Sequence, residues 1–152
     1  MAGQEDIVIE ALKDFPDDVA AFAYYGHVTR SDYVTVVIPD IEDKLNRHKR
    51  VRLYAEIAPD FTGIDPGAVW EDTKLGFGHF LSWERAAMVT DVAWIKQAAR
   101  FFAFLMPGML RVFPTAEAAK ARDWIVNPPK VIYVSRALTF YLAPSGGVRN
   151  PV

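Results

Sequence analysis

The sequence predicts a mixed α/β domain. Its sheet has four to five strands, with an N-terminal antiparallel hairpin, then parallel crossovers, and helices flanking the sheet. Two apolar runs near the N-terminus are separated by only a short polar turn, which favours a hairpin. From residue 50 onward, β-branched apolar runs alternate with helical periodicities, and this alternation requires crossover connections and parallel strands. A chain of 152 residues is long enough to form one hydrophobic core.

The hairpin is predicted from the runs Asp6–Leu12 and Val19–Val28, joined by the turn Phe15-Pro16-Asp17-Asp18. The first helix follows, and we expect Ser31 or Asp32 to cap it. Its inner face is a repeat of large side chains every four residues: Tyr33, Val37, Ile41 and Leu45. Pro39 interrupts this pattern and predicts a kink or a break before the helix ends near residues 47–49.

The later elements follow the same reasoning. The remaining strands are expected at Arg50–Ile57, Arg85–Thr90 and Leu110–Phe113, and the remaining helices at Pro66–Leu81, Val92–Met106 and Thr115–Val126. Asp65, Asp91 and Thr115 are the expected caps of these helices, since each has a side-chain oxygen that can accept a backbone N–H. Pro66 fits the first helical position, where no N–H is needed.

The second helix combines aromatic bulk with intrinsic weakness. Trp70, Phe77 and Phe80 give it a large apolar surface, but Gly76 and Gly78 each cost about 1 kcal/mol relative to alanine. A helix of this composition depends on what it packs against. We therefore interpret it as a cover that can open.

The third helix is also rich in aromatic residues. Its periodicity predicts an inner stripe of Trp94, Ala98, Phe101 and Leu105, with Ile95, Ala99 and Phe102 beside it. Phe104 falls near Lys96 and Arg100, on the side expected to face solvent. We assign Trp94 and Phe102 to the core. Phe77, Phe80, Phe101 and Phe104 supply more apolar surface than a small core needs, which is typical of a ligand pocket, a partner face or a membrane contact.

Composition and motif searches exclude several function classes. The formal net charge of −2 gives no general basic surface for nucleic acid, and the absence of cysteine excludes disulfides, zinc–thiolate sites and cysteine nucleophiles. His27, His48 and His79 lack metal-ligand spacing, and the glycines match no phosphate-binding loop. We expect neither catalysis nor a cofactor or metal.

The expected location is the cytoplasm, because the acidic N-terminus does not have the pattern of a signal peptide and no uncharged apolar run reaches about 20 residues.

An ordered set of motifs carries a family resemblance. It comprises Phe61-x-Gly63, Trp70-x-Asp72-x-Lys74, His79, Arg85-x-Ala87-x-Val89-x-Asp91-x-x-Trp94, Pro107, Arg111-x-Phe113 and Trp124. The set resembles the SpoIIAA-like family, also described as STAS/SEC14-domain proteins. The resemblance covers about Ile7–Ile125 and implies a small α/β domain with a mixed sheet.

The resemblance also implies two kinds of function. Anti-anti-sigma STAS domains carry a phosphorylatable serine at the start of the helix after the third strand, but Phe61–Gly67 contains no serine here, only Thr62. SEC14-type lipid carriers cover an apolar cavity with a mobile helix, and the second helix is similar in character.

We divide the chain into a SpoIIAA-like domain at 1–126 and a C-terminal extension at 127–152. Within the extension, Lys130–Leu142 is apolar and β-branched, is too short to span a bilayer, and contains Arg136. One interpretation is an extra edge strand or a strand exchanged with a second subunit. The other is a segment lying on a membrane surface. The strand is the favoured interpretation.

These observations support the hypothesis of a non-enzymatic domain that binds an apolar or lipid-like ligand and associates peripherally with membranes. The predicted ligand-binding residues are Phe61, Trp70, Lys74, Phe77, His79, Phe80 and Phe101, with Lys74 and His79 meeting a polar head group. The rival hypothesis is a regulatory protein–protein interaction module of the STAS type without the serine. In that module the same aromatic residues form a contact with a partner or within a homo-dimer or higher oligomer.

Overall fold

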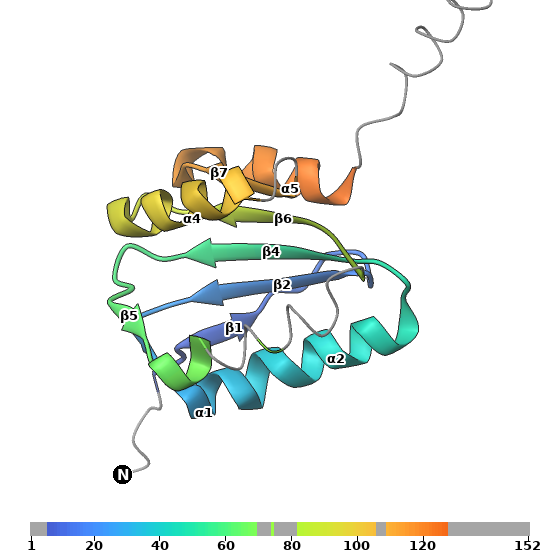
Figure 1. The fold of residues 1–152 in the computed structure, drawn as a ribbon, viewed down its shortest axis with the longest axis horizontal. Coiled ribbons are helices and arrows are strands. Elements are labelled where there is room, and N and C mark those ends of the chain that lie inside the picture. Colours follow the sequence, from blue (N-terminus) through green and yellow to red (C-terminus); the bar gives the residue numbers. More distant parts are fainter. Residues whose placement is uncertain (1–5, 70–73, 75–81, 106–108, 128–152) are drawn as a thin grey trace, which may run out of the picture.

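The computed structural model describes residues 6–69, 74, 82–105 and 109–127. Within them one five-stranded sheet has the order β1-β2-β4-β6-β7 (Figure 1). Its strands are β1 (Ile9–Ala11), β2 (Val19–Tyr24), β4 (Val51–Ile57), β6 (Trp83–Val89) and β7 (Leu110–Phe113). β1 is antiparallel to β2, and the pairs β2–β4, β4–β6 and β6–β7 are parallel. The predicted mixed sheet with an N-terminal hairpin is therefore confirmed.

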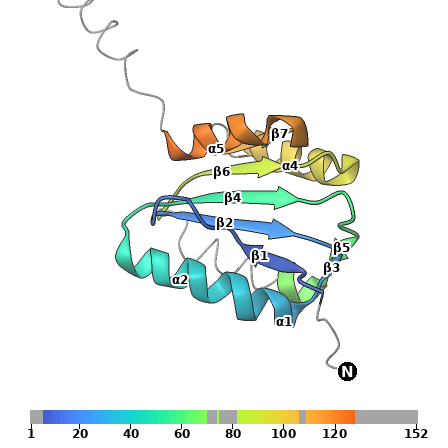
Figure 2. The ribbon, with the colours of Figure 1, turned by 180° about the vertical axis from the view of Figure 1, so that it is seen from behind.

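The helices pack along this sheet. They are α1 (Arg30–Asp32), a π-helical turn (Tyr33–Val37), α2 (Ile38–Arg47), the helical residues 66–69 and 74, α4 (Ala93–Leu105), a 3₁₀ turn (Thr115–Glu117) and α5 (Ala118–Val126). In both views of the ribbon, α1 and α2 lie beside the β1 edge of the sheet, whereas α4 and α5 lie beside β6 and β7 (Figures 1 and 2).

The two faces of the sheet bury separate core clusters. One cluster joins the strands to three helical parts of the chain: α1 to α2 with the π-helical turn between them, the helix start at residue 66, and α4. These parts contribute Tyr33, Val37, Ile41, Ala68 and Ile95. The other cluster lies under α5 and includes Tyr54, Val89, Phe113, Ala121 and Ile125. Both clusters share β2 and β4, whose alternating side chains are buried on both faces, as expected for central parallel strands.

The first helical segment, which comprises α1, the π-helical turn and α2, has Thr29 as its N-cap, two residues before Ser31 and three before Asp32. The Thr29 hydroxyl accepts the N–H of Asp32 at 3.2 Å, and the Asp32 carboxylate accepts the Thr29 N–H at 2.9 Å, which completes a capping box. The expectation that Ser31 or Asp32 is the N-cap is wrong. The inner face is confirmed, because Tyr33, Val37 and Ile41 are buried and Leu45 is partly buried.

The disturbance expected at Pro39 is present as a π-helical turn rather than a break. The N–H of Ile38 bonds to the carbonyl of Tyr33, five residues earlier, and Pro39 then falls in the first turn of α2. A proline in a first turn loses no intrahelical hydrogen bond, so the helix continues through it. α2 ends at Arg47, as predicted.

The single strand predicted over Val19–Val28 is in fact two strands. β2 ends at Tyr24, and Gly26 turns the chain with a φ of +52°, a conformation that glycine adopts at low cost. β3 (His27–Val28) then pairs in parallel with β5 (Gly63–Ile64) in a separate two-stranded sheet. This small sheet holds the segment after β4 in place before the helix at residue 66 begins.

Candidate functional site

α4 begins directly after β6, at a corner where two side chains fix the chain. The Thr90 hydroxyl accepts the N–H of Val92 at 3.0 Å, and the carbonyl of Val92 accepts the N–H of Lys96 at 3.0 Å. Asp91, the expected cap, instead accepts the N–H of Thr115 at 3.2 Å and so ties the helix start to the loop after β7. Hydrogen bonds from the Thr115 side chain and backbone lower the pKa of the Asp91 carboxyl.

The predicted inner stripe of α4 is wrong. Ile95 and Ala99 face the sheet and are buried, whereas Ala98 is exposed and Trp94 and Phe101 are 52% and 62% exposed. Phe102, which was also assigned to the core, is 54% exposed. The sheet is therefore contacted by the smaller side chains of the helix, and the rings point away from it. Phe104 is 81% exposed, as expected from its place beside Lys96 and Arg100.

We define the α4 aromatic surface as Trp94, Phe101, Phe102 and Phe104. Trp94 is anchored at one end, because its ring stacks on buried Phe61 with centroids 6.0 Å apart and planes inclined by 25°. Phe101 and Phe102 meet edge to face at 6.2 Å. The surface therefore has an anchored end at Trp94 and an exposed end at Phe104.

The charges on α4 are all positive. Lys96 and Arg100 belong to the helix, and Ala93–Leu105 contains no acidic residue. Lys96 lies 3.8 Å from the Asp91 carboxylate, and Arg100 is exposed with no ion pair to a described residue. A lipid surface has an apolar layer beneath anionic head groups, and exposed rings flanked by cations can contact both.

A comparison with models of protein families assigns the chain to a family. The SpoIIAA-like family model matches residues 19–126, which is more than half of the chain. The chain belongs to the SpoIIAA-like family. A search of curated proteins gave no match for this SpoIIAA-like protein. One similar solved structure is a crystal structure of an uncharacterized DUF3478-family protein with a SpoIIAA-like fold from Shewanella loihica PV-4. It is 24% identical, has a TM-score of 0.62, and the match covers 77% of this chain and 93% of that one. At this identity the likeness is evidence for the fold alone.

Only part of the predicted binding set can be placed in this SpoIIAA-like domain. Phe61 is buried beneath Trp94, Lys74 is an exposed helical residue, and Phe101 is exposed on α4. Neither of two hollows in the described chain is lined by any of these three residues. The other predicted binding residues lie outside the described residues: Trp70, Phe77, His79 and Phe80.

The start of the helix at residue 66 is better defined. The carbonyl of Asp65 accepts the N–H of Val69 at 3.2 Å, so Asp65 occupies the cap position and Pro66 the first helical position, as predicted. The Asp65 carboxylate hydrogen-bonds the exposed ring of His27 at 2.6 Å, so this histidine belongs to the β3–β5 corner. Among the described residues, no group of three or more His, Cys, Asp or Glu could hold a metal ion.

Sequence reasoning missed two parts of the molecule that have the character of a site. The first is the exposure of Trp94 and Phe102. The small residue Ala99, on the side of α4 away from Trp94, could have indicated the exposure of Trp94, whereas Phe102 lies near Ala99 on the helix and has no such signal. The second is the pair of arginines around Trp124, namely Arg85 and Arg111. No local motif connects these two arginines, because they come together only through the register of β6 and β7.

Proposed function

We propose that this SpoIIAA-like domain is a non-enzymatic binding module that docks on an anionic lipid surface through the α4 aromatic surface. The observation that carries the proposal is the row of rings exposed on a helix whose only charges are positive. No helix in the described part of the chain is long and apolar enough to cross a membrane. The proposed contact is therefore peripheral.

The exposed rings supply enough apolar area for such a contact. With about 150–250 Å² for an aromatic side chain, Phe101, Phe102 and Phe104 leave roughly 300–500 Å² exposed. Transfer of that area out of water contributes about 7–12 kcal/mol at ~25 cal/mol per Å², before the costs of association. Lys96 and Arg100 add attraction to anionic head groups, on the order of 1 kcal/mol for each charge near the membrane surface.

The test is co-sedimentation of the full chain with vesicles of phosphatidylcholine alone and of phosphatidylcholine with phosphatidylserine. We expect binding to the anionic vesicles that weakens as salt rises. Phe104→Ser and Phe101→Ser should each reduce the bound fraction several-fold. Ile7→Ser is the matched control, because Ile7 is 68% exposed but lies at the other edge of the sheet, near β1. Full-length protein that stays in solution with both kinds of vesicle would contradict the proposal.

The rival is an interaction module in which the same rings contact a partner protein or a second copy of the chain. The exposed fractions of Trp94 and Phe101 suit either partner, and the charges of Lys96 and Arg100 favour the lipid. Light scattering of the full chain distinguishes the two. If Phe104→Ser converts a dimer to a monomer while vesicle binding is absent in both proteins, the interaction module replaces the lipid proposal.

A further inference from the structure

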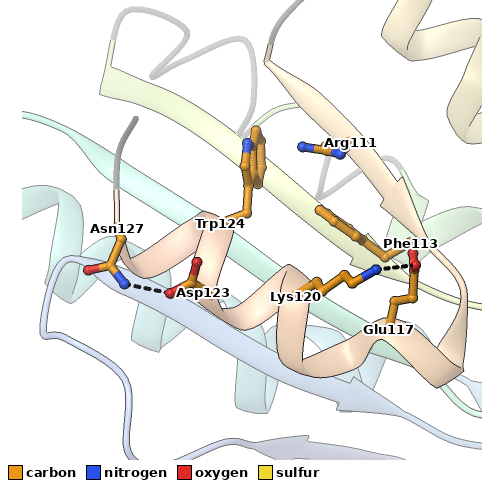
Figure 3. Close-up of a pocket in the computed structure, with 7 residues that line it drawn as sticks. All are labelled: Arg111, Phe113, Glu117, Lys120, Asp123, Trp124 and Asn127. Carbon is orange, nitrogen blue, oxygen red and sulfur yellow. Dashed lines mark hydrogen bonds and ion pairs between the residues drawn. The ribbon is translucent and has the colours of Figure 1, made fainter. Parts of the chain in front are cut away.

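A hollow lies between β7 and α5, on the face of the sheet opposite α4. It encloses about 330 Å³, close to the lower end of the size range of small-molecule sites, roughly 300–1,000 Å³. Phe113 and Trp124 give it two aromatic walls, and their ring centroids lie 6.0 Å apart. Arg111 reaches over it from β7 (Figure 3).

The charged side chains around this hollow differ in whether they already have a hydrogen-bond partner. Lys120 donates to Glu117 at 2.8 Å, and the side-chain amide of Asn127 donates to Asp123 at 2.8 Å, so both acidic side chains of the lining already accept hydrogen bonds (Figure 3). Arg111 is exposed and has no ion pair with a described residue. Its guanidinium is held over Phe113 at 4.9 Å and near Trp124 at 5.9 Å. A guanidinium held by rings keeps its N–H donors available for a planar acid group.

A second arginine contacts the same indole. Arg85 on β6 is 6% exposed, and its guanidinium carbon lies 4.9 Å from the centroid of the Trp124 ring. Its Nε and Nη2 are buried and have no hydrogen-bond partner among the described residues. Its register neighbour Arg52 cannot relieve it, because Arg52 carries the same charge. Burial lowers the pKa of Arg85, and the charge of Arg52 adds to this effect, whereas the Glu84 carboxylate opposes it.

We propose that the hollow between β7 and α5 binds a small organic acid. Its carboxylate pairs with Arg111, and its apolar body lies against Phe113 and Trp124. Arg85 does not line the hollow, but its buried positive charge behind the indole favours a negative ligand over a neutral or positive one. This site is distinct from the α4 aromatic surface, and its ligand is independent of the proposed membrane contact.

The probe is benzoate, which combines a carboxylate with one ring and fits the volume of the hollow. The full chain, labelled with nitrogen-15, is titrated while the indole N–H signal of Trp124 is followed by NMR; Trp124→Phe identifies that signal. We expect a saturable shift with benzoate and none with benzyl alcohol, its neutral counterpart. Inorganic phosphate separates a simple anion from an organic acid and should bind more weakly, because it has no apolar body.

Variants assign the contact to Arg111. Arg111→Gln should weaken benzoate binding by about tenfold or more, since a charge-assisted hydrogen-bonded pair is lost. Arg122→Gln is the matched control: Arg122 is exposed on the same helix α5, but its guanidinium lies 4.4 Å from the Phe15 ring, so we place it outside the hollow. Arg111 is exposed, so the Arg111→Gln protein should stay folded and keep a well-dispersed NMR spectrum.

Three results would overturn the inference. One is the absence of a saturable shift of the Trp124 signal with benzoate. Another is equal weakening by Arg111→Gln and Arg122→Gln. Phosphate binding as tightly as benzoate would overturn the assignment of an organic acid.

Discussion

Arg52 and Arg85 occupy paired positions on β4 and β6, yet their surroundings differ sharply. Arg52 donates to both carboxylate oxygens of Asp18 at 2.7 and 2.8 Å and to the carbonyls of Ile125 and Val126, where it caps the C-terminal end of α5. Arg85 instead lies against the Trp124 ring, and its Nε and Nη2 have no hydrogen-bond partner among the described residues. The Asp18 carboxylate and the two carbonyls compensate the buried charge of Arg52, although its Nε has no partner among the described residues. An unpaired buried charge costs several kcal/mol.

We therefore expect opposite stability changes on removal of the two charges. Arg85→Met should raise the free energy of unfolding by about 1 kcal/mol or more, because a buried charge without a partner is replaced by an apolar side chain. Arg52→Met should lower it by about 3–5 kcal/mol, because Asp18 and the α5 carbonyls lose their donor. Urea unfolding in a buffer free of carboxylates measures both changes. Equal destabilisation by the two substitutions would show that Arg85 is as well paired as Arg52.

Asp17 joins the turn between β1 and β2 to the end of α2. Its carboxylate accepts hydrogen bonds from the His48 ring at 2.6 Å and from the Arg47 guanidinium. These bonds, the His48 bond first and then the Arg47 bond, lower the pKa of Asp17 from 3.8 to about 2. Since the folded state holds the ionised form, Asp17 stabilises the fold above about pH 4, and that stabilisation is lost as the pH falls towards 2.

The corresponding prediction concerns acid unfolding. Asp17→Asn should unfold at lower urea concentration than the wild type at pH 6, and the difference between the two proteins should shrink between pH 4 and pH 2. Because Asp17 is exposed, the effect will be modest and weaker in high salt. Asp14→Asn, in the same connection between β1 and β2, is the control. A difference that stays constant across this pH range would contradict a lowered pKa at Asp17.

At the scale of elements, the sequence predicted the strands best. β4, β6 and β7 lie within two residues of their expected bounds. A parallel strand that is buried on both faces gives a short, mostly apolar run, and charged or polar residues mark its ends. β3 and β5 were missed as a separate sheet, since two-residue pairings have no periodicity to detect. The inner face of α4 was wrong because the helix is apolar on most sides. The size of the aromatic side chains then favoured them as the buried face of α4, whereas Ile95 and Ala99 are the residues that contact the sheet.

The cap of the first helical segment gives a test at this scale. Thr29→Ala should lower the free energy of unfolding by about 1 kcal/mol, because the capping box loses the oxygen that accepts the Asp32 N–H. Ser31→Ala is the matched control, since Ser31 lies in α1 and is not its cap, and it should change stability by less than about 0.5 kcal/mol. Thermal unfolding followed by circular dichroism compares the two. A larger loss of unfolding free energy for Ser31→Ala than for Thr29→Ala would show that Ser31, as predicted, is the cap.

At the scale of the whole molecule, the domain is built from two core clusters that share one sheet, and the described members of both clusters lie within residues 8–126. Of the candidate sites, the sequence indicated that aromatic surface was in excess and that Phe104 faced outward. It could not indicate the hollow at Trp124, because Arg111 and Trp124 belong to different elements and meet only through tertiary packing. Whether Trp70, Phe77, His79 and Phe80 share a site with Phe61 stays a prediction.

Because the described members of both clusters end at Val126, we expect a chain ending at Asn127 to fold on its own. Its thermal unfolding should stay cooperative, and its midpoint should lie within a few degrees of that of the full chain. Light scattering on both proteins then reports the role of residues 128–152. A dimer that becomes a monomer on truncation would support the strand-exchange interpretation of the extension. Loss of cooperative unfolding would show that these residues belong to the core.

The π-helical turn at Tyr33–Val37 has a consequence for how this chain tolerates changes in length. Side chains spaced four residues apart advance by about 40° per step around a regular helix, so a run of them would drift off the sheet. The wider turn absorbs part of that drift and keeps Tyr33 and Ile41 on the same side. Deletion of Thr35 would leave Tyr33 and Ile41 seven residues apart, which is two turns of an ordinary helix, and so keep both on the same side. An insertion or deletion in the regular turns of α2 has no such compensation and rotates the side chains after it by about 100°. The segment should therefore tolerate the loss of one residue from the π-helical turn but not a change of length within α2.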